Sequence, residues 1–457
     1  MKRFMKQLIP SLLGSFLVLS MVTPVNAEQK SGMLPLSGTV KGELTETDAN
    51  QVYDLILTEA GRLKIDMTSF VSKRAYVQLV DSYNETIYSR SLYGNQQTPA
   101  RDVTTIDLEK GTYQFMVYDD YGSDDLGTYS ITTQFTPMKT NDREPNNGTA
   151  QAQDLAFGKM TKGYLSKQDN KDVYRVKLTK AGRLSFDFSS SIEARAYFQL
   201  TDEYNESIFS NRVYASWNNP GKYTPYIDLE PGTYYVNIYD DYGYDDTGTY
   251  ELKSTFVPAL NQEVEPNNGT AEAKTFPFYQ TRTGFLSWND SVDVYKIVVP
   301  KTSRIGIDIT SYVSNRAVVG LYDDENNEVV GKYLYGSSKA PVRYKENVTL
   351  TRGTYYLSVR DDYGRDDTGK YKVRVTSSHL LPTVTVNQVT ARSTKVSGKT
   401  EKGATVTMTI GKKSYKRTAD AKGNYSFSIS KQKAGTSIKI SSKNKYGSSV
   451  KTMKVSK

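Results

Sequence analysis

Cysteine is absent from this chain of 457 residues, and histidine occurs once, as His379. The lack of cysteine excludes disulfide bonds, thiolate nucleophiles and cysteine-bound zinc, and a single histidine argues against the His-based triads of familiar hydrolases. We expect His379 to be a linker residue. Tryptophan is scarce, with 2 copies, whereas tyrosine, which favours strands and wet contact surfaces, occurs 36 times. These proportions favour a β-rich extracellular binding protein.

Long hydrophobic runs are also missing, apart from one at the N-terminus. The basic residues Lys2, Arg3 and Lys6 precede the largely apolar stretch 8–22, and small residues lead up to Ala27 as at a signal-peptidase site. The stretch is shorter than the roughly 20 residues of a membrane-spanning helix. We therefore expect cleavage after Ala27, no membrane span in the mature chain, and secretion, with association to the cell wall as a further destination.

A period of 121 residues divides most of the chain into three copies. The segment Gly111-Thr112-Tyr113, for example, recurs at 232–234 and 353–355. Within each copy apolar and polar residues alternate, which predicts antiparallel strands with one buried face. In the first copy the predicted buried columns are Leu63, Ile65, Met67, Tyr113, Phe115 and Val117. The pattern predicts an all-β protein with three tandem antiparallel β-sandwich or jelly-roll repeats.

The segment from Pro382 onward lacks this period and is predicted to be a small Ig-like β-sandwich, with strands at 384–386, 405–410, 425–429 and 437–440. It contains 17 Lys and Arg against two acidic residues, a net charge of +15. Subtracting this and the +3 of the signal peptide from the total of +9 leaves −9 on residues 28–381. The predicted domains are the signal peptide 1–27, the repeats 37–138, 142–258 and 263–378, and the basic Ig-like domain 382–457.

A linker with the sequence Glu-Pro-Asn-Asn-Gly-Thr-Ala occurs at 144–150 and again at 265–271. Each copy precedes a domain that contains Asp-x-x-Asp-Val-Tyr and closes with Gly-Thr-Tyr and Gly-x-Tyr strands. This order resembles the bacterial pre-peptidase C-terminal (PPC) domain, the family that includes the collagen-binding domains of clostridial collagenases. The basic segment is similar to bacterial Ig-like domains. The resemblance implies that the repeats are accessory modules of the kind that accompany secreted proteases. Some modules of this family bind Ca²⁺ where the linker meets the sandwich. No protease domain is expected in this chain.

Oxygen-bearing side chains concentrate in both linkers and at the start of the strand that follows. Ca²⁺ takes six to eight hard oxygen ligands, and these side chains match the pattern of the family. The first copy lacks both halves of the set, because the position 121 residues before Glu144 falls in the expected signal peptide and the counterpart of Asp172 is Gln51. The alternative is a solvated linker held by Asx-turns. The candidate ligands of two predicted Ca²⁺ sites are Asp142, Glu144, Asn146, Asn147, Asp169 and Asp172, and Glu263, Glu265, Asn267, Asn268, Asp290 and Asp293.

An acidic loop recurs in all three copies, with four aspartates within seven residues. Such a density of like charge favours neutralisation by a cation or by arginine, and Arg74, Arg195 and Arg316 are candidate partners. A simple hairpin, in which Gly122, Gly243 and Gly364 supply positive φ, is the alternative, as is an acidic surface for a basic partner. The candidate second-cation or acidic-loop residues are Asp119, Asp120, Asp124, Asp125, Asp240, Asp241, Asp245, Asp246, Asp361, Asp362, Asp366 and Asp367.

Two further surfaces are candidates for binding. Aromatic residues near the middle of each copy could form a platform for protein or glycan, with ordinary sheet packing and tyrosine exposure as the alternative. They are Tyr83, Tyr88, Tyr93, Tyr204, Tyr214, Trp217, Tyr333 and Tyr335. In the basic domain Lys412, Lys413, Lys416 and Arg417 form a run suited to a polyanion, such as the anionic cell-wall polymers of a Gram-positive type of cell. A generic soluble basic module is the alternative, and nucleic acid is not expected.

These features together predict a secreted, non-enzymatic binding or adhesion protein. Ca²⁺ would stabilise its repeats, which bind an extracellular protein or polysaccharide, while the basic domain holds anionic cell-wall polymer. Two alternatives remain. One is an accessory or inhibitory partner of a separate secreted protease, and the other is a carboxylate-based glycan hydrolase. The aspartates of the acidic loop recur in every copy, whereas a catalytic site is normally formed once, which favours a binding protein.

Overall fold

A computed structural model describes residues 30–119, 124–240, 246–362 and 364–457. The expected signal peptide lies outside this part of the chain, as do the loop residues Asp120, Gly122, Asp241, Gly243 and Asp245. Within the described ranges the one helical element is a short 3-10 turn, η1 (Ser378–Leu380), which contains the exposed His379. No helix in these ranges is both long and apolar enough to cross a membrane.

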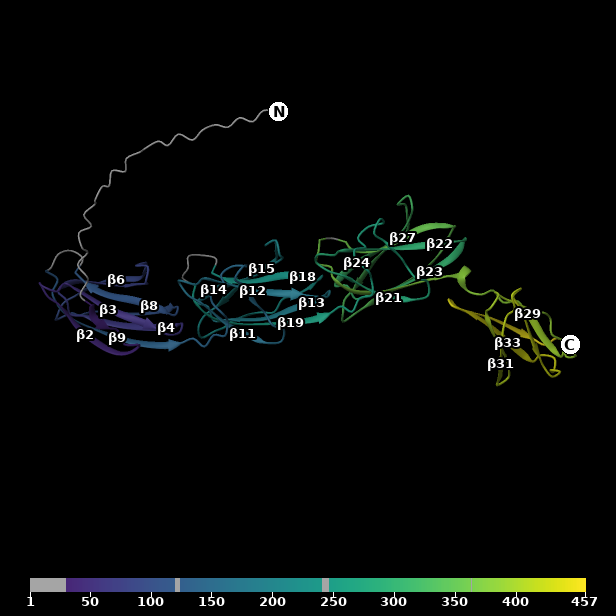
Figure 1. Cartoon of the computed structure of the whole chain (residues 1–457), viewed down its shortest axis with the longest axis horizontal. Coiled ribbons are helices and arrows are strands. Elements are labelled where there is room, and N and C mark those ends of the chain that lie inside the picture. Colours follow the sequence, from purple (N-terminus) through teal and green to yellow (C-terminus); the bar gives the residue numbers. More distant parts are fainter. Residues whose placement is uncertain (1–29, 120–123, 241–245, 363) are drawn as a thin grey trace, which may run out of the picture. The chain divides into compact units, whose positions relative to one another are not determined.

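The chain forms two compact units, and the residues up to Lys139, with Ser166–Asp169, make up the first. It contains a β-sandwich, the first sandwich, with one sheet in the order β1-β3-β8-β5-β6 and another in the order β2-β9-β4-β7 (Figure 1). Its strands are β1 (Lys30–Met33), β2 (Ser37–Leu44), β3 (Asn50–Leu57), β4 (Gly61–Ser69), β5 (Lys73–Val80), β6 (Thr86–Gly94), β7 (Ala100–Leu108), β8 (Gly111–Tyr118) and β9 (Gly127–Pro137).

The core of the first sandwich is built from alternate residues of its strands. Leu63, Ile65 and Met67 of β4 are buried, and Tyr113, Phe115 and Val117 of β8 are buried as well. Burial of each large apolar side chain contributes about 1.5–3 kcal/mol, and the period-2 spacing places all of them between the sheets. The predicted buried columns are therefore confirmed.

The second unit begins with two further sandwiches. The second sandwich has sheets in the orders β10-β12-β18-β14-β15 and β11-β19-β13-β16, with β17 also paired to β13. Its strands are β10 (Gln153–Asp154), β11 (Met160–Leu165), β12 (Lys171–Leu178), β13 (Gly182–Ser190), β14 (Ala194–Thr201), β15 (Ser207–Ala215), β16 (Gly221–Tyr223), β17 (Tyr226–Leu229), β18 (Gly232–Tyr239) and β19 (Gly248–Pro258).

The third sandwich has the same plan, with sheets in the orders β20-β22-β27-β24-β25 and β21-β28-β23-β26. Its strands are β20 (Lys274–Thr275), β21 (Thr281–Leu286), β22 (Val292–Val299), β23 (Ser303–Ser311), β24 (Asn315–Asp323), β25 (Glu328–Gly336), β26 (Val342–Leu350), β27 (Gly353–Asp361) and β28 (Gly369–Ser377). The predicted all-β sandwich fold is thus confirmed. One detail differs: the short strands β1, β10 and β20 pair parallel to β3, β12 and β22, and the other strand pairs are antiparallel.

The C-terminal domain consists of a two-stranded sheet, β29-β32, and a four-stranded sheet, β31-β30-β33-β34. Its strands are β29 (Lys395–Lys399), β30 (Thr405–Ile410), β31 (Lys413–Thr418), β32 (Asn424–Ser428), β33 (Ser437–Asn444) and β34 (Gly447–Lys454). Buried residues from both sheets, including Val396, Val406 and Phe427, form its core. Three of the four predicted strands are present.

The predicted strand at 384–386 is wrong. Val384 makes one isolated bridge with Thr400. The amide of Thr385 donates to the carbonyl of Lys399, but the return bond from the Lys399 amide goes to the hydroxyl of Thr385, and Tyr425 donates its hydroxyl to the Thr385 carbonyl. Because side chains take the places of backbone partners, no regular ladder forms here.

Candidate functional site

The linker 263–268 is tied to the third sandwich through Asn267. The backbone amide of Val294 donates to the carbonyl of Asn267 over 2.8 Å, and the amide of Asn267 donates to Glu265 Oε2 over 3.0 Å. This pairing places the linker beside Asp293, the neighbour of Val294. Carboxylate oxygens of Glu263, Glu265 and Asp293 accordingly lie within 4.8 Å of one another.

A pair of buried tyrosines orients two of these carboxylates. Tyr371 donates its hydroxyl to Asp293 Oδ2 over 2.7 Å, and the Tyr295 hydroxyl lies 3.0 Å from Glu263 Oε2 and 2.5 Å from the Tyr371 hydroxyl, to one of which it donates. Burial, with the negative charge of Asp293, raises the pKa of both tyrosines well above the usual value, so both remain proton donors. The tyrosines therefore fix carboxylates of a group whose spacing could hold a metal ion.

Several buried polar atoms at linker 263–268 have no hydrogen-bond partner among the described residues. They are Oδ1 of Asp290, Oδ1 of Asp293, and both Oδ1 and Nδ2 of Asn267, which is 2% exposed. An unsatisfied buried polar group costs about 1–3 kcal/mol. Burial also raises the pKa of Asp290 to about 6 and that of Glu263 to about 7. Hard oxygens with destabilised negative charge fit a cation of the Ca²⁺ type.

The linker 142–147 repeats most of this arrangement. Carboxylate oxygens of Asp142, Glu144 and Asp172 lie within 4.8 Å of one another, and Tyr250 donates its hydroxyl to Asp172. The backbone amide of Asn146 donates to Glu144 Oε2 over 3.0 Å, as in the third sandwich, but the side chain differs from that of Asn267, because its Nδ2 donates to Glu144 Oε1 over 2.9 Å. Asn147 Oδ1 accepts from the Asn146 backbone, and Asp169 and Asp172 are both buried. The linker acids and the strand acid Asp172 predicted from sequence are thus brought together here.

The first sandwich keeps the tyrosines of this motif but lacks the strand acid. Tyr53 and Tyr129 share a hydrogen bond of 2.8 Å between their hydroxyls, as their counterparts do in the other sandwiches. At the position of the strand acid, Gln51 donates its amide to Asp48. The tyrosine pair is therefore part of the sandwich itself, and the carboxylates are an addition to it in the second and third sandwiches.

A joint between the second and third sandwiches lies beside linker 263–268, and it was not foreseen from the sequence. The backbone of Trp288 donates to the carbonyl of Asp228, and Thr368 Oγ1 donates to Asp228 Oδ2, each over 2.9 Å. Asp228 also accepts two bonds, of 2.8 and 2.6 Å, from the guanidinium of Arg183. One buried carboxylate therefore serves both its own sheet and the next sandwich.

Replacing Asp228 with alanine is expected to lower the free energy of unfolding by about 2–3 kcal/mol, because the change leaves Arg183 and Thr368 without their acceptor. The loss stays below that of a fully buried pair, since the Arg183 side chain is 31% exposed. Asp308→Ala is the matched control: it removes a similar cross-strand pair with Arg343, but at a 25% exposed carboxylate, and should cost less than about 1 kcal/mol. Equal losses in urea denaturation would contradict this ranking.

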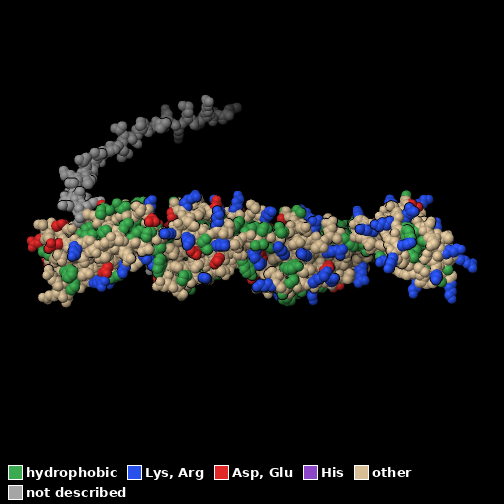
Figure 2. Space-filling model, turned by 90° about the horizontal axis from the view of Figure 1, so that it is seen from below, with side chains coloured by type: hydrophobic (Ala, Val, Ile, Leu, Met, Phe, Trp, Pro, Cys, Tyr) green, Lys and Arg blue, Asp and Glu red, His purple; other side chains and the backbone are tan. Residues whose placement is uncertain are grey.

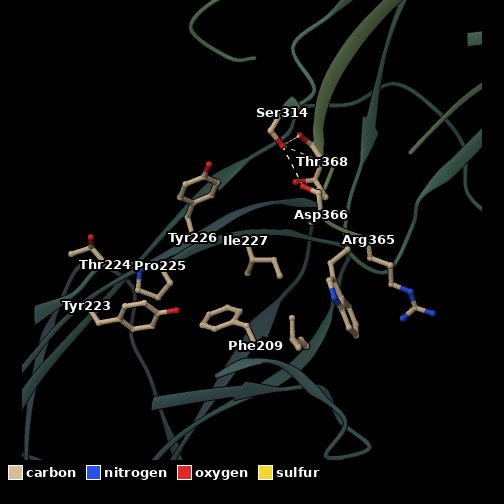
Figure 3. Close-up of a pocket in the computed structure, with 12 residues that line it drawn as sticks. Phe209, Tyr223, Thr224, Pro225, Tyr226, Ile227, Ser314, Arg365, Asp366 and Thr368 are labelled. Atoms are coloured by element: carbon tan, nitrogen blue, oxygen red, sulfur yellow. Dashed lines mark hydrogen bonds between the residues drawn. The ribbon is translucent and has the colours of Figure 1, made fainter. Parts of the chain in front are cut away.

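A cavity of about 550 Å³ opens at the same joint (Figure 3). Its wall from the second sandwich includes Phe209, Tyr223 and Ile227, and the third sandwich contributes Trp288 and Thr368. The strand that is continuous in the other sandwiches, as β7 and β26, is broken here between β16 and β17 at Thr224-Pro225. Proline lacks the amide that a ladder needs, so the break leaves an apolar hollow with hydroxyl groups at its edge.

A basic side chain from another strand lies near the described aspartates of each acidic loop. Lys73 forms an ion pair with Asp124, Arg316 forms one with Asp362, and Arg195 Nε lies 3.7 Å from Asp246. Two groups of carboxylates can still converge within 4.8 Å. They are Asp119, Asp124 and Asp125 in the first sandwich, and Asp361, Asp366 and Asp367 in the third. Basic neighbours thus supply part of the neutralisation expected of a cation.

Most of the candidate aromatic platform is exposed. Tyr83, Tyr93, Tyr204, Tyr214, Tyr333 and Tyr335 expose half or more of their surface, and Trp217 exposes 38%. Tyr88 is the exception, because it is partly buried and donates its hydroxyl to Asp102. Tyr93, Tyr214, Tyr333 and Tyr335 lie on β6, β15 and β25, the outer strands of their sheets. The guanidinium of Arg74 lies 6.0 Å from the ring centre of Tyr93, and that of Arg316 lies 5.4 and 6.0 Å from those of Tyr333 and Tyr335.

The basic run of the C-terminal domain lies on an exposed edge strand. Lys413, Lys416 and Arg417 belong to β31, all of whose residues are exposed, and Lys412 directly precedes it. Figure 2 shows blue side chains over this domain with little red. The net charge of +15 is therefore presented at the surface, as a polyanion would require.

Comparisons with known proteins identify one family. Residues 382–456 match the model for the bacterial Ig domain, which agrees with the predicted Ig-like fold. Among solved structures the chain is similar to the pre-peptidase C-terminal domain of collagenase from Bacillus anthracis, at 24% identity over 25% of this chain and 100% of that one, with a TM-score of 0.19.

Two more distant similarities span larger parts of the chain. Tandem CBM51 modules of a family 98 glycoside hydrolase from Streptococcus pneumoniae are 7% identical over 48% of this chain and 84% of theirs, with a TM-score of 0.17. A Ca²⁺-stabilised adhesin with which an Antarctic bacterium binds ice is 12% identical over 92% of this chain and 99% of its own, with a TM-score of 0.15. No curated protein matches the sequence.

Proposed function

We propose that the protein is a secreted, non-enzymatic binding or adhesion protein whose tandem β-sandwiches are stabilised by Ca²⁺ at their linkers. The observation that carries the proposal is the set of buried side-chain oxygens on Asn267, Asp290 and Asp293 that have no hydrogen-bond partner among the described residues. Hard oxygens in this number, beside the carboxylates of Glu263 and Glu265, are what Ca²⁺ requires. In the second sandwich Asp142, Glu144 and Asp172 play the same part.

The binding surfaces follow from the same architecture. The exposed aromatic residues of the outer strands and the cavity at the joint offer an extracellular protein or polysaccharide apolar faces flanked by hydroxyl groups. The C-terminal domain, with its exposed basic strand β31, holds the chain near anionic cell-wall polymer. The metal has a structural role in this proposal, and the chain's own side chains make the contacts with both kinds of partner.

Isothermal titration calorimetry of the full chain tests the metal sites. Two Ca²⁺ ions per chain are expected to bind at the linkers, and a chelator is expected to lower the melting temperature, because an ion that binds only the folded state stabilises it by mass action. The control is Mg²⁺, which keeps its own water shell and should bind much more weakly to sites lined by several protein oxygens. A chain with no heat of Ca²⁺ binding and no response to chelator would refute the proposal.

A further inference from the structure

One departure from the 121-residue repeat separates the first two copies, which precede a linker, from the third. Asp107-Leu108-Glu109 recurs as Asp228-Leu229-Glu230, whereas the third copy reads Thr349-Leu350-Thr351. The first two copies are followed by an acidic linker, and the third is followed by the C-terminal domain. The two acids are therefore not needed to build a sandwich. They occur where a sandwich precedes a linker.

The structure places Glu230 at the joint. Its backbone amide donates to Asn289 Oδ1 over 3.0 Å, and Asn289 Nδ2 donates to the hydroxyl of Tyr234 over 3.1 Å. Asn289 directly precedes Asp290, one of the buried acids of the third sandwich. The end of β17 in the second sandwich is thus bonded to the turn that presents Asp290.

The side chain of Glu230 belongs to the same electrostatic environment as the linker acids. Its Oε1 atom is buried and has no hydrogen-bond partner within the described ranges. Burial, followed by the negative charge of Asp290, raises the pKa of Glu230 to about 7; a hydrogen bond with the Ser287 side chain opposes the shift, and the charge of Glu263 adds to it. The carboxylate therefore adds negative charge to a cluster that already contains unsatisfied oxygens on Asn267 and Asp293, which is unfavourable unless a cation lies among them.

We propose that Glu230 takes part in the coordination of Ca²⁺ at linker 263–268, directly or through a bound water, so that the ion joins the second sandwich to the third. The inference rests on the proposed Ca²⁺ site and adds a ligand from the preceding sandwich. A site made only from residues 263–293 would stabilise the third sandwich alone. With Glu230 included, occupancy of the site also determines how firmly two neighbouring sandwiches are held together.

Tryptophan fluorescence can report this site separately from the other. The chain has two tryptophans, and Trp288 lies at the joint, with its backbone bonded to Asp228. In a Trp217→Phe background, a Ca²⁺ titration of the full chain should follow Trp288 alone. Glu230→Thr, which installs the residue found at position 351, is expected to weaken the Ca²⁺ affinity about 10-fold or more. Glu272→Gln, at an exposed linker acid, is the control and should leave the affinity unchanged.

Distance measurements test the mechanical consequence. Because cysteine is absent, spin labels can be placed at Asn211→Cys on β15 and Lys332→Cys on β25, which are exposed counterparts in the second and third sandwiches. Ca²⁺ is expected to narrow the distribution of label distances in the parent chain. In Glu230→Thr the distribution should stay broad at a Ca²⁺ concentration that saturates the parent.

The outcomes separate the two proposals. Unchanged Ca²⁺ affinity and an unchanged distance distribution in Glu230→Thr would overturn the role of Glu230 and leave the linker site intact. A parent chain that shows neither a fluorescence change nor calorimetric heat with Ca²⁺ would overturn the metal site itself, and the role of Glu230 with it. Thermal melting in chelator shows whether Glu230→Thr is folded, so a loss of affinity cannot be confused with a loss of structure.

Discussion

Asp293→Asn is expected to abolish tight Ca²⁺ binding at linker 263–268. The variant should be less stable than the parent when Ca²⁺ is present and at least as stable as the parent when the metal is removed. With Ca²⁺ at 1,000 times its dissociation constant, the ion stabilises the folded state by about 4 kcal/mol. The variant would lose this contribution, and the melting temperature of the third sandwich should fall by on the order of 10 °C. Of the changes to single residues considered for this chain, we expect this one to have the largest effect.

The reversal in chelator follows from the chemistry of the site. Asp293 is fully buried, and burial together with the charge of Glu263 raises its pKa well above the usual range. Without a cation, the carboxylate destabilises the fold, and asparagine removes the charge while it can still accept the hydroxyl of Tyr371. In chelator the variant should therefore be at least as stable as the parent. No metal-independent role of Asp293 predicts such a crossing.

Scanning calorimetry with Ca²⁺ and with chelator gives all four melting temperatures for this comparison. Asp324→Asn makes the same chemical change at an exposed loop position of the third sandwich and should behave like the parent under both conditions. If Asp293→Asn lowered the melting temperature equally with and without Ca²⁺, the carboxylate would be a structural hydrogen-bond acceptor rather than a metal ligand.

Much of the fold was predictable because it depends on local alternation and on repetition. Columns such as Leu63, Ile65 and Met67 need only the two-residue period of a strand, and the internal repeat locates the same columns in each copy. The linker acids were predictable for a related reason. The linker acid Glu144 and the strand acid Asp172 are both absent from the first copy, where Thr23 and Gln51 occupy their positions, which suggests a common task.

The residues of the joint could not be predicted in the same way. Asp228 and Glu230 lie more than 30 residues before the linker they approach, at the end of a strand, where an acid looks like ordinary surface. The signal in the sequence was a departure from the repeat, with Thr349 and Thr351 in place of two acids. To interpret it, one must know which residues of the second and third sandwiches contact each other at the joint. The cavity was hidden for a similar reason, since Pro225 shows that a strand breaks but not what lies opposite the break.

The second large effect is expected from reversing the charge of the basic run. Lys412→Glu, Lys413→Glu, Lys416→Glu and Arg417→Glu together should lower the affinity of the full chain for anionic wall polymer by about three orders of magnitude at low salt. Each basic residue near an anionic surface contributes roughly 1 kcal/mol, and 1.4 kcal/mol is about tenfold in affinity. The fold should tolerate the changes because every side chain of β31 is exposed.

Cosedimentation with wall polymer at increasing NaCl measures this effect, since salt screens charges beyond about a Debye length and should release the parent progressively. The matched control reverses four other exposed charges of the same domain, Arg392, Lys395, Lys431 and Lys433, which changes the net charge by the same amount. A smaller loss in the control would locate the contact at β31. Equal losses would assign binding to the net charge of the whole domain, and retention of the parent at any salt concentration would contradict an electrostatic attachment altogether.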